Sequence, residues 1–302
     1  LAAALPRALS ASTAVDPTTL AQALDSRGVA IARGAVDVTA VHRAREGWEA
    51  LRGDPRAYVR LLDFSKAGGI RGAVHGGEGT RAEVALPCGG PFKPAAFLPT
   101  AILRAVRAHL GCRPRLEMAV VIESRPGAED QRFHTDVHLE GLLPEGHDRP
   151  CPARAGVVVA VPLIEVTSRN GPFECLPGTH GLSKAALRDL FRGCPPEEAP
   201  PGAETFLAAP LAPGDCLLYA RDLVHRGRGQ APGPGAGPRP VAFFSFVPEA
   251  LLELAGEDLD HDYLGTFPPL AQRHGEAWLR AADEAFAAEG GAGPGGDAPA
   301  AA

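Results

Sequence analysis

Three side chains of the 302-residue sequence, His134, Asp136 and His225, have the types and spacing of a metal site. Residues two apart on an extended segment point to the same face, so His134 and Asp136 would project side by side. His225 follows the apolar run CLLYA, and we expect it at the far end of that strand. Two histidines and one carboxylate form the facial triad of non-haem Fe(II) oxygenases. Each motif alone is weak, but the set predicts an iron site.

Arg239 is the fourth candidate, because it stands directly before the apolar run PVAFFSFV. A charge at the base of an apolar strand needs a partner if it is buried, and the planar guanidinium can grip a carboxylate with two parallel hydrogen bonds. The distal carboxylate of 2-oxoglutarate would be such a partner. A solvated Arg at the start of a strand is the alternative.

The secondary structure that must position these residues changes along the chain. The first part is helical, a β-rich half follows, and one more helix is expected at the end. We expect helices over 16–26, 39–52, 99–110, 183–191 and Leu270 to Ala288, and strands at VAIARGAV, LEMAVVIES, AGVVVAVPLIEV, CLLYA and PVAFFSFV. Gly and Pro clusters separate the strands. This order predicts a mainly β protein with flanking helices (α+β), a double-stranded β-helix or cupin-like jelly roll.

The predicted domain organisation is simple. Residues 1–15 form a flexible N-terminus, 16–289 a single jelly-roll domain with N-terminal helices and a C-terminal helix, and 290–302 a low-complexity, disordered tail. The Gly-rich segment from Lys66 to Arg81 is too long for an ordinary connection. We predict that it is a lid over the substrate entrance, with an ordinary surface loop as the alternative.

Composition excludes several classes of protein. The chain has 30 basic and 36 acidic residues and a net charge of −6, which gives no electrostatic footprint for nucleic acid. No apolar run is long enough to span a membrane. Six cysteines at irregular spacings, without a C-x-x-C pair, favour free thiols. These features predict a soluble intracellular protein, cytoplasmic by default; the Ala- and Ser-rich opening stretch suggests a trimmed transit peptide as an organellar alternative.

The segment NGPFECLPGTHG, Asn170 to Gly181, resembles a signature of the phytanoyl-CoA dioxygenase family. Other marks follow the family's order: a helix, Gly and strand from Leu20 to Val36, the turn Arg125-Pro126-Gly127 before H-x-D, and PGD at Pro213 to Asp215 before the distal histidine. The resemblance covers about Leu20 to Val247. One departure concerns Arg239, which follows His225 by fourteen residues, a few more than is usual, with the extra length in the loop APGPGAGP.

The resemblance implies an Fe(2+)- and 2-oxoglutarate-dependent dioxygenase of the EC 1.14.11 type. In this interpretation His134, Asp136 and His225 bind the metal and Arg239 binds 2-oxoglutarate. The reaction consumes dioxygen, releases succinate and carbon dioxide, and hydroxylates a small organic substrate. The family's substrates are diverse, so the substrate is not predicted.

Three alternatives stay open beside this interpretation. A catalytically inactive jelly-roll binding module would not need an intact triad. A cupin-type metalloenzyme without 2-oxoglutarate would not need Arg239. His138 lies on the same face as Asp136 and is the best alternative ligand. A halogenase in the same fold needs an open coordination position where the carboxylate would be, and the presence of Asp136 argues against it.

Overall fold

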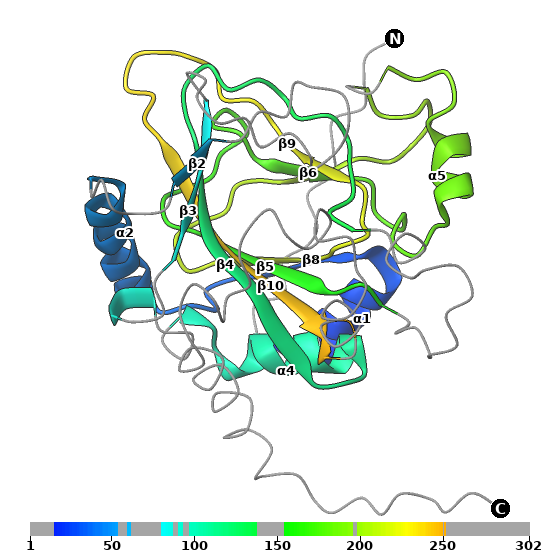
Figure 1. Ribbon diagram of the computed structural model, residues 1–302, viewed down its shortest axis with the longest axis horizontal. Helices are drawn as coiled ribbons and strands as arrows, with labels where there is room; N and C mark the ends of the chain where they lie inside the picture. Colours follow the sequence, from blue (N-terminus) through cyan, green and yellow to red (C-terminus); the bar gives the residue numbers. More distant parts are fainter. Residues whose placement is uncertain are drawn as a thin grey trace, which may run out of the picture.

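The computed structural model describes residues 15–53, 59–61, 80–86, 90–92, 97–137, 154–195, 198–249 and 251. Its helices are α1 (Pro17–Arg27), α2 (Val38–Gly53), the short 3-10 helix η2 (Gly90–Phe92), α4 (Thr100–Leu110) and α5 (Lys184–Leu190). Its strands are β1 (Val29–Ala32), β2 (Val59–Leu61), β3 (Arg81–Ala85), β4 (Pro114–Ser124), β5 (Val157–Pro162), β6 (Phe173–Cys175), β7 (Phe206–Ala208), β8 (Cys216–Ala220), β9 (His225–Gly227) and β10 (Arg239–Pro248). Figure 1 shows their arrangement.

Local sequence explains where the first helix begins and ends. The Asp16 carboxylate accepts hydrogen bonds from the backbone N–H groups of Thr18 and Thr19, and Pro17 occupies the first turn. Gly28 ends the helix at φ 75°, a left-handed conformation that glycine adopts without a steric penalty. These features confirm the helix that the sequence predicted from Asp16 onward.

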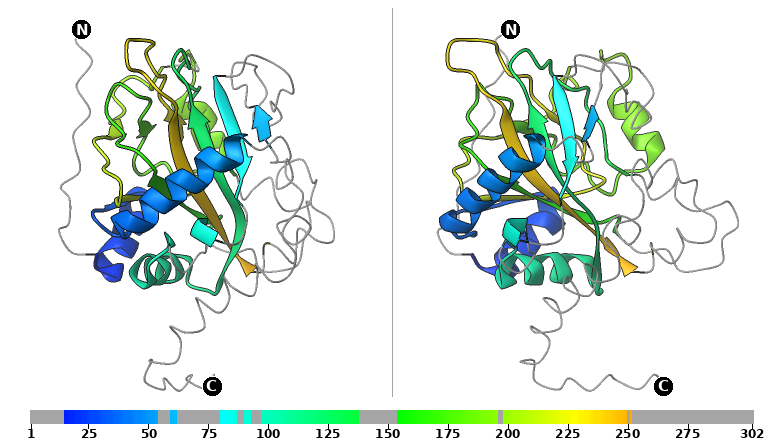
Figure 2. Two further views of the ribbon diagram at one scale, coloured as in Figure 1. Left: turned by 90° about the vertical axis from the view of Figure 1, so that its left-hand side faces the viewer. Right: turned by 60° about the vertical axis from the view of Figure 1, so that its left-hand side comes forward.

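Two antiparallel sheets form a jelly roll. The larger has the order β1-β8-β5-β10-β4-β3-β2, and the smaller has the order β7-β6-β9. The helices α1 and α4 lie against one face of the larger sheet, while β6 and β9 lie over the other face (Figure 1). Figure 2 shows α2 lying across the strands on the helix side. The predicted double-stranded β-helix is thereby confirmed, as are the helices at 39–52, 99–110 and 183–191 to within two residues at each end.

Alternating residues of the larger sheet divide into two cores. On β10, Ala242, Phe244 and Phe246 pack with the helices, whereas Val241 packs toward the smaller sheet. This alternation follows from the two-residue period of a strand. The second core fills the space between the sheets and leads to the residues that the sequence singled out.

One prediction about the distal histidine is wrong in detail. We expected His225 at the far end of the strand that contains CLLYA, but β8 ends at Ala220 and His225 begins β9, in the other sheet. The chain turns between the two strands, where Leu223 N–H bonds to the Ala220 carbonyl at 3.0 Å. The turn carries the histidine across the space between the sheets.

Several predictions concern residues outside the described ranges. These are the lid over residues 66–79, the final helix from Leu270 to Ala288, both chain ends and the alternative ligand His138. Among the described cysteines, Cys112, Cys175, Cys194 and Cys216 are free thiols, in line with the prediction. No helix within the described ranges has the length and apolar character needed to cross a membrane.

Candidate metal centre

The three predicted ligands come from two backbone segments that pair with each other. His134 and His225 form an isolated antiparallel bridge, with N–H···O distances of 2.9 and 2.8 Å. The Asp136 N–H bonds to the Arg221 carbonyl at 2.9 Å and so holds the carboxylate beside the same crossing. We expected the H-x-D motif on an extended chain; in the structure it lies outside the named strands, with His134 in the isolated bridge and Asp136 at a bend.

Hydrogen bonds fix the orientation of both imidazole rings. His134 Nδ1 lies 2.9 Å from the Arg132 carbonyl oxygen, and His225 Nδ1 lies 2.9 Å from the Leu223 carbonyl oxygen. A carbonyl can only accept, so each Nδ1 must carry the proton and donate it. Each Nε2 is then left with a lone pair, which is the state that a metal ligand requires.

The two Nε2 atoms face the same carboxylate. The Asp136 Oδ1 atom lies 3.6 Å from His225 Nε2 and 4.0 Å from His134 Nε2. One ligand atom from each of the three residues lies within 4.8 Å of the others. These separations are too long for hydrogen bonds, and small side-chain rotations would bring all three atoms onto one cation. The donor set and its geometry therefore fit a metal of the Fe(II) type.

The electrostatics of the site favour a neutral His134 ring. Burial, followed by the nearby His225, lowers the pKa of His134 to about 4. His225 is buried, whereas about a quarter of the His134 and Asp136 side chains is exposed, which leaves one side of the triad accessible. A metal would therefore not have to displace a proton from His134 at neutral pH.

An aromatic wall surrounds His225. Phe173 stacks on the His225 ring at a centroid distance of 5.1 Å, and Tyr219 lies 4.8 Å from it. The Tyr219 hydroxyl is hydrogen-bonded to Asp136; burial and this carboxylate raise the pKa of Tyr219 well above its usual value. The phenol therefore stays protonated and donates to the carboxylate. Phe173 and Tyr219 hold the histidine and the aspartate in place and exclude water from one side.

A row of three polar residues crosses the larger sheet near the triad. Ser124 on β4 pairs with Arg81 on β3 and with Arg239 on β10, at the same register on adjacent strands. Residues in one row point to the same face. That face is the one toward the smaller sheet, because Val241 is two residues from Arg239 and packs there.

Arg239 is a buried cation whose Nε has no hydrogen-bond partner. No acidic residue in the described part of the chain forms an ion pair with it. Burial, followed by the charge of Arg81, lowers the pKa of Arg239 to about 9. The Ser124 hydroxyl is also buried without a hydrogen-bond partner. Buried polar groups of this kind are stable only with a partner, so the row is suited to an anion.

Arg81, the third member of this row, is buried and is held partly by the end of the strand that carries His225. Its guanidinium donates to the Arg228 carbonyl at 3.1 Å and approaches the Gly227 carbonyl at 3.4 Å. Burial lowers the pKa of Arg81 to about 10, although Asp130 opposes the shift. The positive charge of Arg81 also acts on His134, so the cationic row and the triad belong to one site.

The NGP signature shapes the wall beside Arg239. Gly171 has φ 84°, and a Cβ there would lie 2.8 Å from the Arg228 carbonyl oxygen and 3.5 Å from Arg239 Nε. Only glycine allows this close approach at this backbone conformation. His180, in the same signature, lies with its Nε2 atom 3.1 Å from the carbonyl oxygen of Asp25, on α1.

Sequence reasoning missed Arg81, Ser124 and Tyr219 as residues of the site. Arg81 was assigned to the end of the lid segment, but it begins β3. Strand pairing places Arg81 and Ser124 in one row with Arg239, and the fold brings Tyr219 against the Asp136 carboxylate. Pairing of that kind is not visible in a single sequence.

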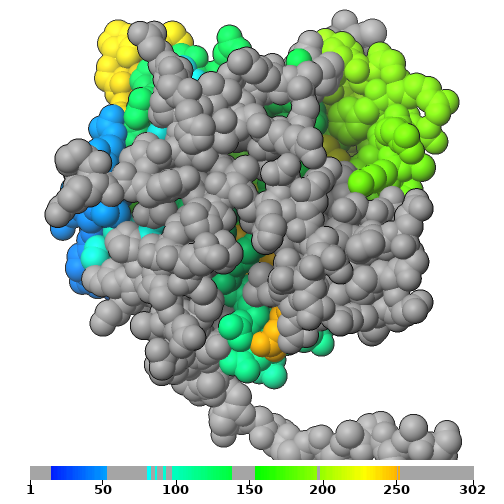
Figure 3. Space-filling view, viewed as in Figure 1, coloured from blue at the N-terminus to red at the C-terminus, as the bar shows by residue number. Residues whose placement is uncertain are grey.

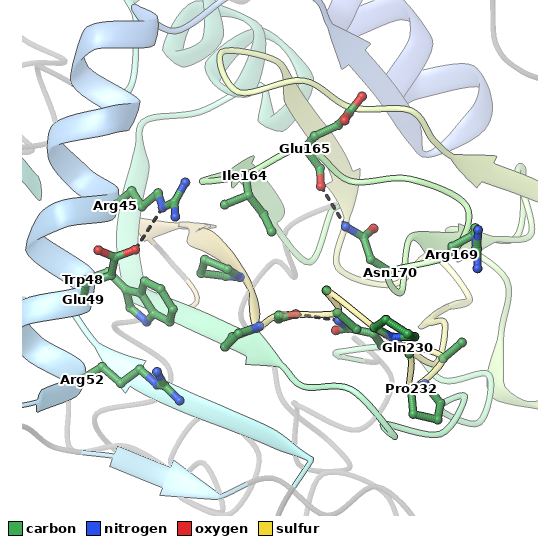
Figure 4. Close-up of a pocket in the computed structure, with 18 residues that line it drawn as sticks. Arg45, Trp48, Glu49, Arg52, Ile164, Glu165, Arg169, Asn170, Gln230 and Pro232 are labelled. Atoms are coloured by element: carbon green, nitrogen blue, oxygen red, sulfur yellow. Dashed lines mark hydrogen bonds and ion pairs between the residues drawn. The ribbon is translucent and has the colours of Figure 1, made fainter.

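A cavity of about 750 Å³ lies elsewhere, between α2 and the loops 164–170 and 230–238 (Figure 4). Arg45, Trp48 and Arg52 come from α2, and Asn170 and Gln230 come from the two loops (Figure 4). No member of the triad lines it, so it is separate from the candidate metal centre.

The segment joining β9 and β10, in yellow, forms the corner of the surface opposite α5 (Figure 3).

The fold and the triad together define a jelly-roll protein with a candidate mononuclear metal site. A family model for phytanoyl-CoA dioxygenase (PhyH) matches residues 24–231. The chain therefore belongs to the phytanoyl-CoA dioxygenase family, as its motifs suggested. No curated protein matches the sequence.

Solved structures share the fold at low sequence identity. The epimerase SnoN from nogalamycin biosynthesis, described as non-heme and alpha ketoglutarate dependent, has a TM-score of 0.55 and 15% identity, covering 83% of this chain and 91% of its own. HygX from Streptomyces hygroscopicus, solved with nickel and 2-oxoglutarate, has a TM-score of 0.51 and 19% identity, covering 76% and 87%. EctD from S. alaskensis, with 2-oxoglutarate and 5-hydroxyectoine, has a TM-score of 0.51 and 17% identity, covering 81% and 80%.

Proposed function

We propose that this protein is an Fe(II)- and 2-oxoglutarate-dependent dioxygenase that hydroxylates a small organic substrate. The observation that carries the proposal is the pair of Nε2 lone pairs facing one carboxylate, with the buried Arg239 beside them. In this proposal His134, Asp136 and His225 hold the iron. Family membership and the ligands of HygX and EctD support it.

The bound iron and 2-oxoglutarate would supply the oxidising chemistry, in which 2-oxoglutarate and dioxygen give succinate, carbon dioxide and a hydroxylated C–H position. The chain's own residues bind and orient. Arg239 would grip the distal carboxylate of 2-oxoglutarate through its planar fork, and Ser124 would add a hydroxyl donor. Arg81 adds positive charge on the same face, and a dicarboxylate would balance it.

Other residues keep the ligands in their reactive states. The carbonyls of Arg132 and Leu223 hold each imidazole in the tautomer that has its lone pair on Nε2. Tyr219 donates to Asp136 and helps to orient its carboxylate. Phe173 shields the His225 ring from water. We further propose that residues 16–289 form one jelly-roll domain, because both sheets contribute to this site.

The test is succinate release from 2-oxoglutarate with Fe(II), measured with and without a panel of small organic candidates. We expect slow uncoupled release from the wild-type protein, stimulated by a true substrate. Asp136→Ala is the matched variant and should reduce release to background. A wild-type protein that binds Fe(II) but never consumes 2-oxoglutarate would favour a metalloenzyme of another type. A protein that binds neither would favour the inactive binding module.

A further inference from the structure

Four charged side chains form a compact network beside the candidate metal centre. Glu174 Oε2 accepts from Arg226 Nε at 2.6 Å and from Arg228 Nη1 at 3.1 Å. Asp130 Oδ2 lies 2.9 Å from Arg228 Nε and 3.8 Å from Arg226 Nη1. Glu174 and Arg226 are buried, whereas Arg228 and Asp130 are about one third exposed.

The network joins three backbone segments that lie side by side. Glu174 is the central residue of β6 and pairs directly with Arg226 on β9. On its other edge, β9 pairs with the segment that leads to His134, through Gln131 N–H to the Gly227 carbonyl at 2.9 Å. Asp130 stands on that segment. The four charges therefore connect β6, the strand of His225 and the segment of His134.

The network and the metal ligands occupy opposite faces of β9. Glu174 pairs with Arg226, whereas the next pair along the two strands is Cys175 with His225. Successive residues of a strand point to opposite faces, so Arg226 points away from the triad while His225 points toward it. The network therefore does not lie on the face that holds the metal ligands, and the backbone of β9 links the two.

A stacking contact adds a second connection. The Arg226 guanidinium lies over the Phe133 ring, 4.3 Å from its centroid, and Phe133 is the residue before His134. Arg226 itself is the residue after His225. One side chain therefore contacts the neighbour of one ligand and is covalently next to the other. The stack limits sliding between the two segments, since a displaced guanidinium would lose the ring and the Glu174 carboxylate together.

The glycines of HRGRG allow the segments to lie this close. A Cβ at Gly229 would lie 2.6 Å from the backbone oxygen of Ala128, and one at Gly227 would lie 2.7 Å from Gln131 Oε1. The Gly227 and Gly229 N–H groups donate to Gln131 Oε1 and Asp130 Oδ1, both at 2.5 Å. In this alternating sequence, the arginines form the ion pairs on one face of the strand, and the glycines allow the backbone of the neighbouring segment to lie close.

We propose that the network centred on Glu174 is a positioning device that sets the separation of His225 from His134 and thereby the affinity and geometry of the metal site. The inference rests on the proposed metal site and deepens it. A buried carboxylate shared by two guanidiniums is satisfied in one arrangement only, because any shift strands a buried charge. Loss of a group bonded directly to a metal ligand typically lowers metal affinity by about 10- to 100-fold, and the lower end of that range suits a network that acts through the residues next to the ligands.

The test uses Co(II), whose absorption spectrum reports ligand geometry, in place of Fe(II) with the full chain. Glu174→Gln keeps the shape of the side chain and removes its charge, and we expect Co(II) affinity to fall by roughly tenfold or more with a changed visible spectrum. Arg228→Gln touches the network from its exposed side and should give a smaller change of the same kind. Asp189→Asn, in an exposed ion pair with Arg192, is the matched control and should leave both unchanged.

The outcomes separate this inference from the proposed function. A wild-type chain that binds no Co(II) and no Fe(II) would contradict the proposed metal site itself. Wild-type binding, with unchanged affinity and spectrum in Glu174→Gln and Arg228→Gln, would overturn the positioning role alone. If Glu174→Gln does not fold, Asp130→Asn and Arg228→Gln decide, because both residues are partly exposed. A melting temperature measured for each variant shows whether the metal effect exceeds any loss of stability.

Discussion

The two faces of the larger sheet differ in what they bury. Toward the helices, β10 presents Ala242, Phe244 and Phe246, and the core there is apolar. Toward the smaller sheet, the same strand begins with Arg239, in a row with Ser124 and Arg81. An apolar face stabilises the fold, whereas buried polar groups without partners oppose folding. We infer that adjacent residues of one strand stabilise the fold on one face and are suited to ligand binding on the other.

The exception on the helix face supports this distinction. Glu123, next to Ser124, is fully buried on the helix side, but Arg52 of α2 lies 2.9 Å and Arg125 lies 2.6 Å from its carboxylate. That charge is paired within the protein and ties α2 to the sheet. Arg239 has no such acidic partner in the described residues, so its charge is available to a ligand.

The largest expected effect is a loss of stability from a substitution on the helix-facing side of the larger sheet. Phe244 is fully buried and lies 5.6 Å from the Phe97 ring. Phe244→Ala should lower the free energy of unfolding by about 3–5 kcal/mol, because it leaves a cavity in a close-packed core. Phe243→Ala, one residue earlier and partly exposed on the other face, is the control and should cost about 1–2 kcal/mol. Equal losses in denaturant titrations would mean that the two faces do not differ as described.

A second effect on the helix side depends on pH. Burial, followed by the charge of Arg154, lowers the pKa of His109 on α4 to about 4 from 6.5. Because burial disfavours the charged ring, the folded protein takes up the His109 proton less readily than the unfolded chain. The free energy of unfolding is therefore undiminished above pH 6.5 and falls as the pH drops toward 4. At 1.36 kcal/mol per unit of pKa, the loss amounts to about 3 kcal/mol. Unfolding at several pH values should show a shallower acid loss in His109→Gln; the same acid profile in both proteins would contradict the assignment.

The next prediction concerns ligand binding on the face of the larger sheet that points toward the smaller sheet. Arg239→Lys keeps the charge but loses the fork, so 2-oxoglutarate affinity should fall by roughly ten- to a hundredfold, the equivalent of about 1.5–3 kcal/mol. The exposed Arg192→Lys is the control, with no expected change. The measurement is the Michaelis constant for 2-oxoglutarate, or its dissociation constant in the presence of metal. An unchanged constant in Arg239→Lys would rule out its assignment.

The smallest expected effect concerns the two buried serines. Ser124→Ala removes an unpartnered hydroxyl, so stability should not fall, while 2-oxoglutarate affinity should weaken by a factor of about 2–10. Ser245→Ala removes a hydroxyl that donates to Glu117 at 3.1 Å, so stability should fall by about 1 kcal/mol without an effect on 2-oxoglutarate. The reverse pattern in thermal unfolding and binding would contradict the role of the polar row.

Sequence predicted the elements well where local signals are strong. Asp16 and Gly28 mark the ends of α1, and runs of β-branched residues mark the strands. It could not predict that His225 starts a strand of the other sheet, because the turn after Ala220 contains neither Gly nor Pro. Nor could it place Arg81 beside Arg239, because that neighbourhood exists only through the pairing of β3 and β10 with β4.

The most direct test of the proposed site is calorimetric titration of the metal-free protein with Fe(II) under anaerobic conditions, followed by 2-oxoglutarate. We expect one Fe(II) per chain, and 2-oxoglutarate binding that is strong only after Fe(II) is present. In Asp136→Ala and His225→Ala both binding events should be lost or weakened by orders of magnitude, while the fold is kept. Fe(II) binding of equal strength in the wild-type protein and in both variants would contradict the assignment of His134, Asp136 and His225 as the metal ligands.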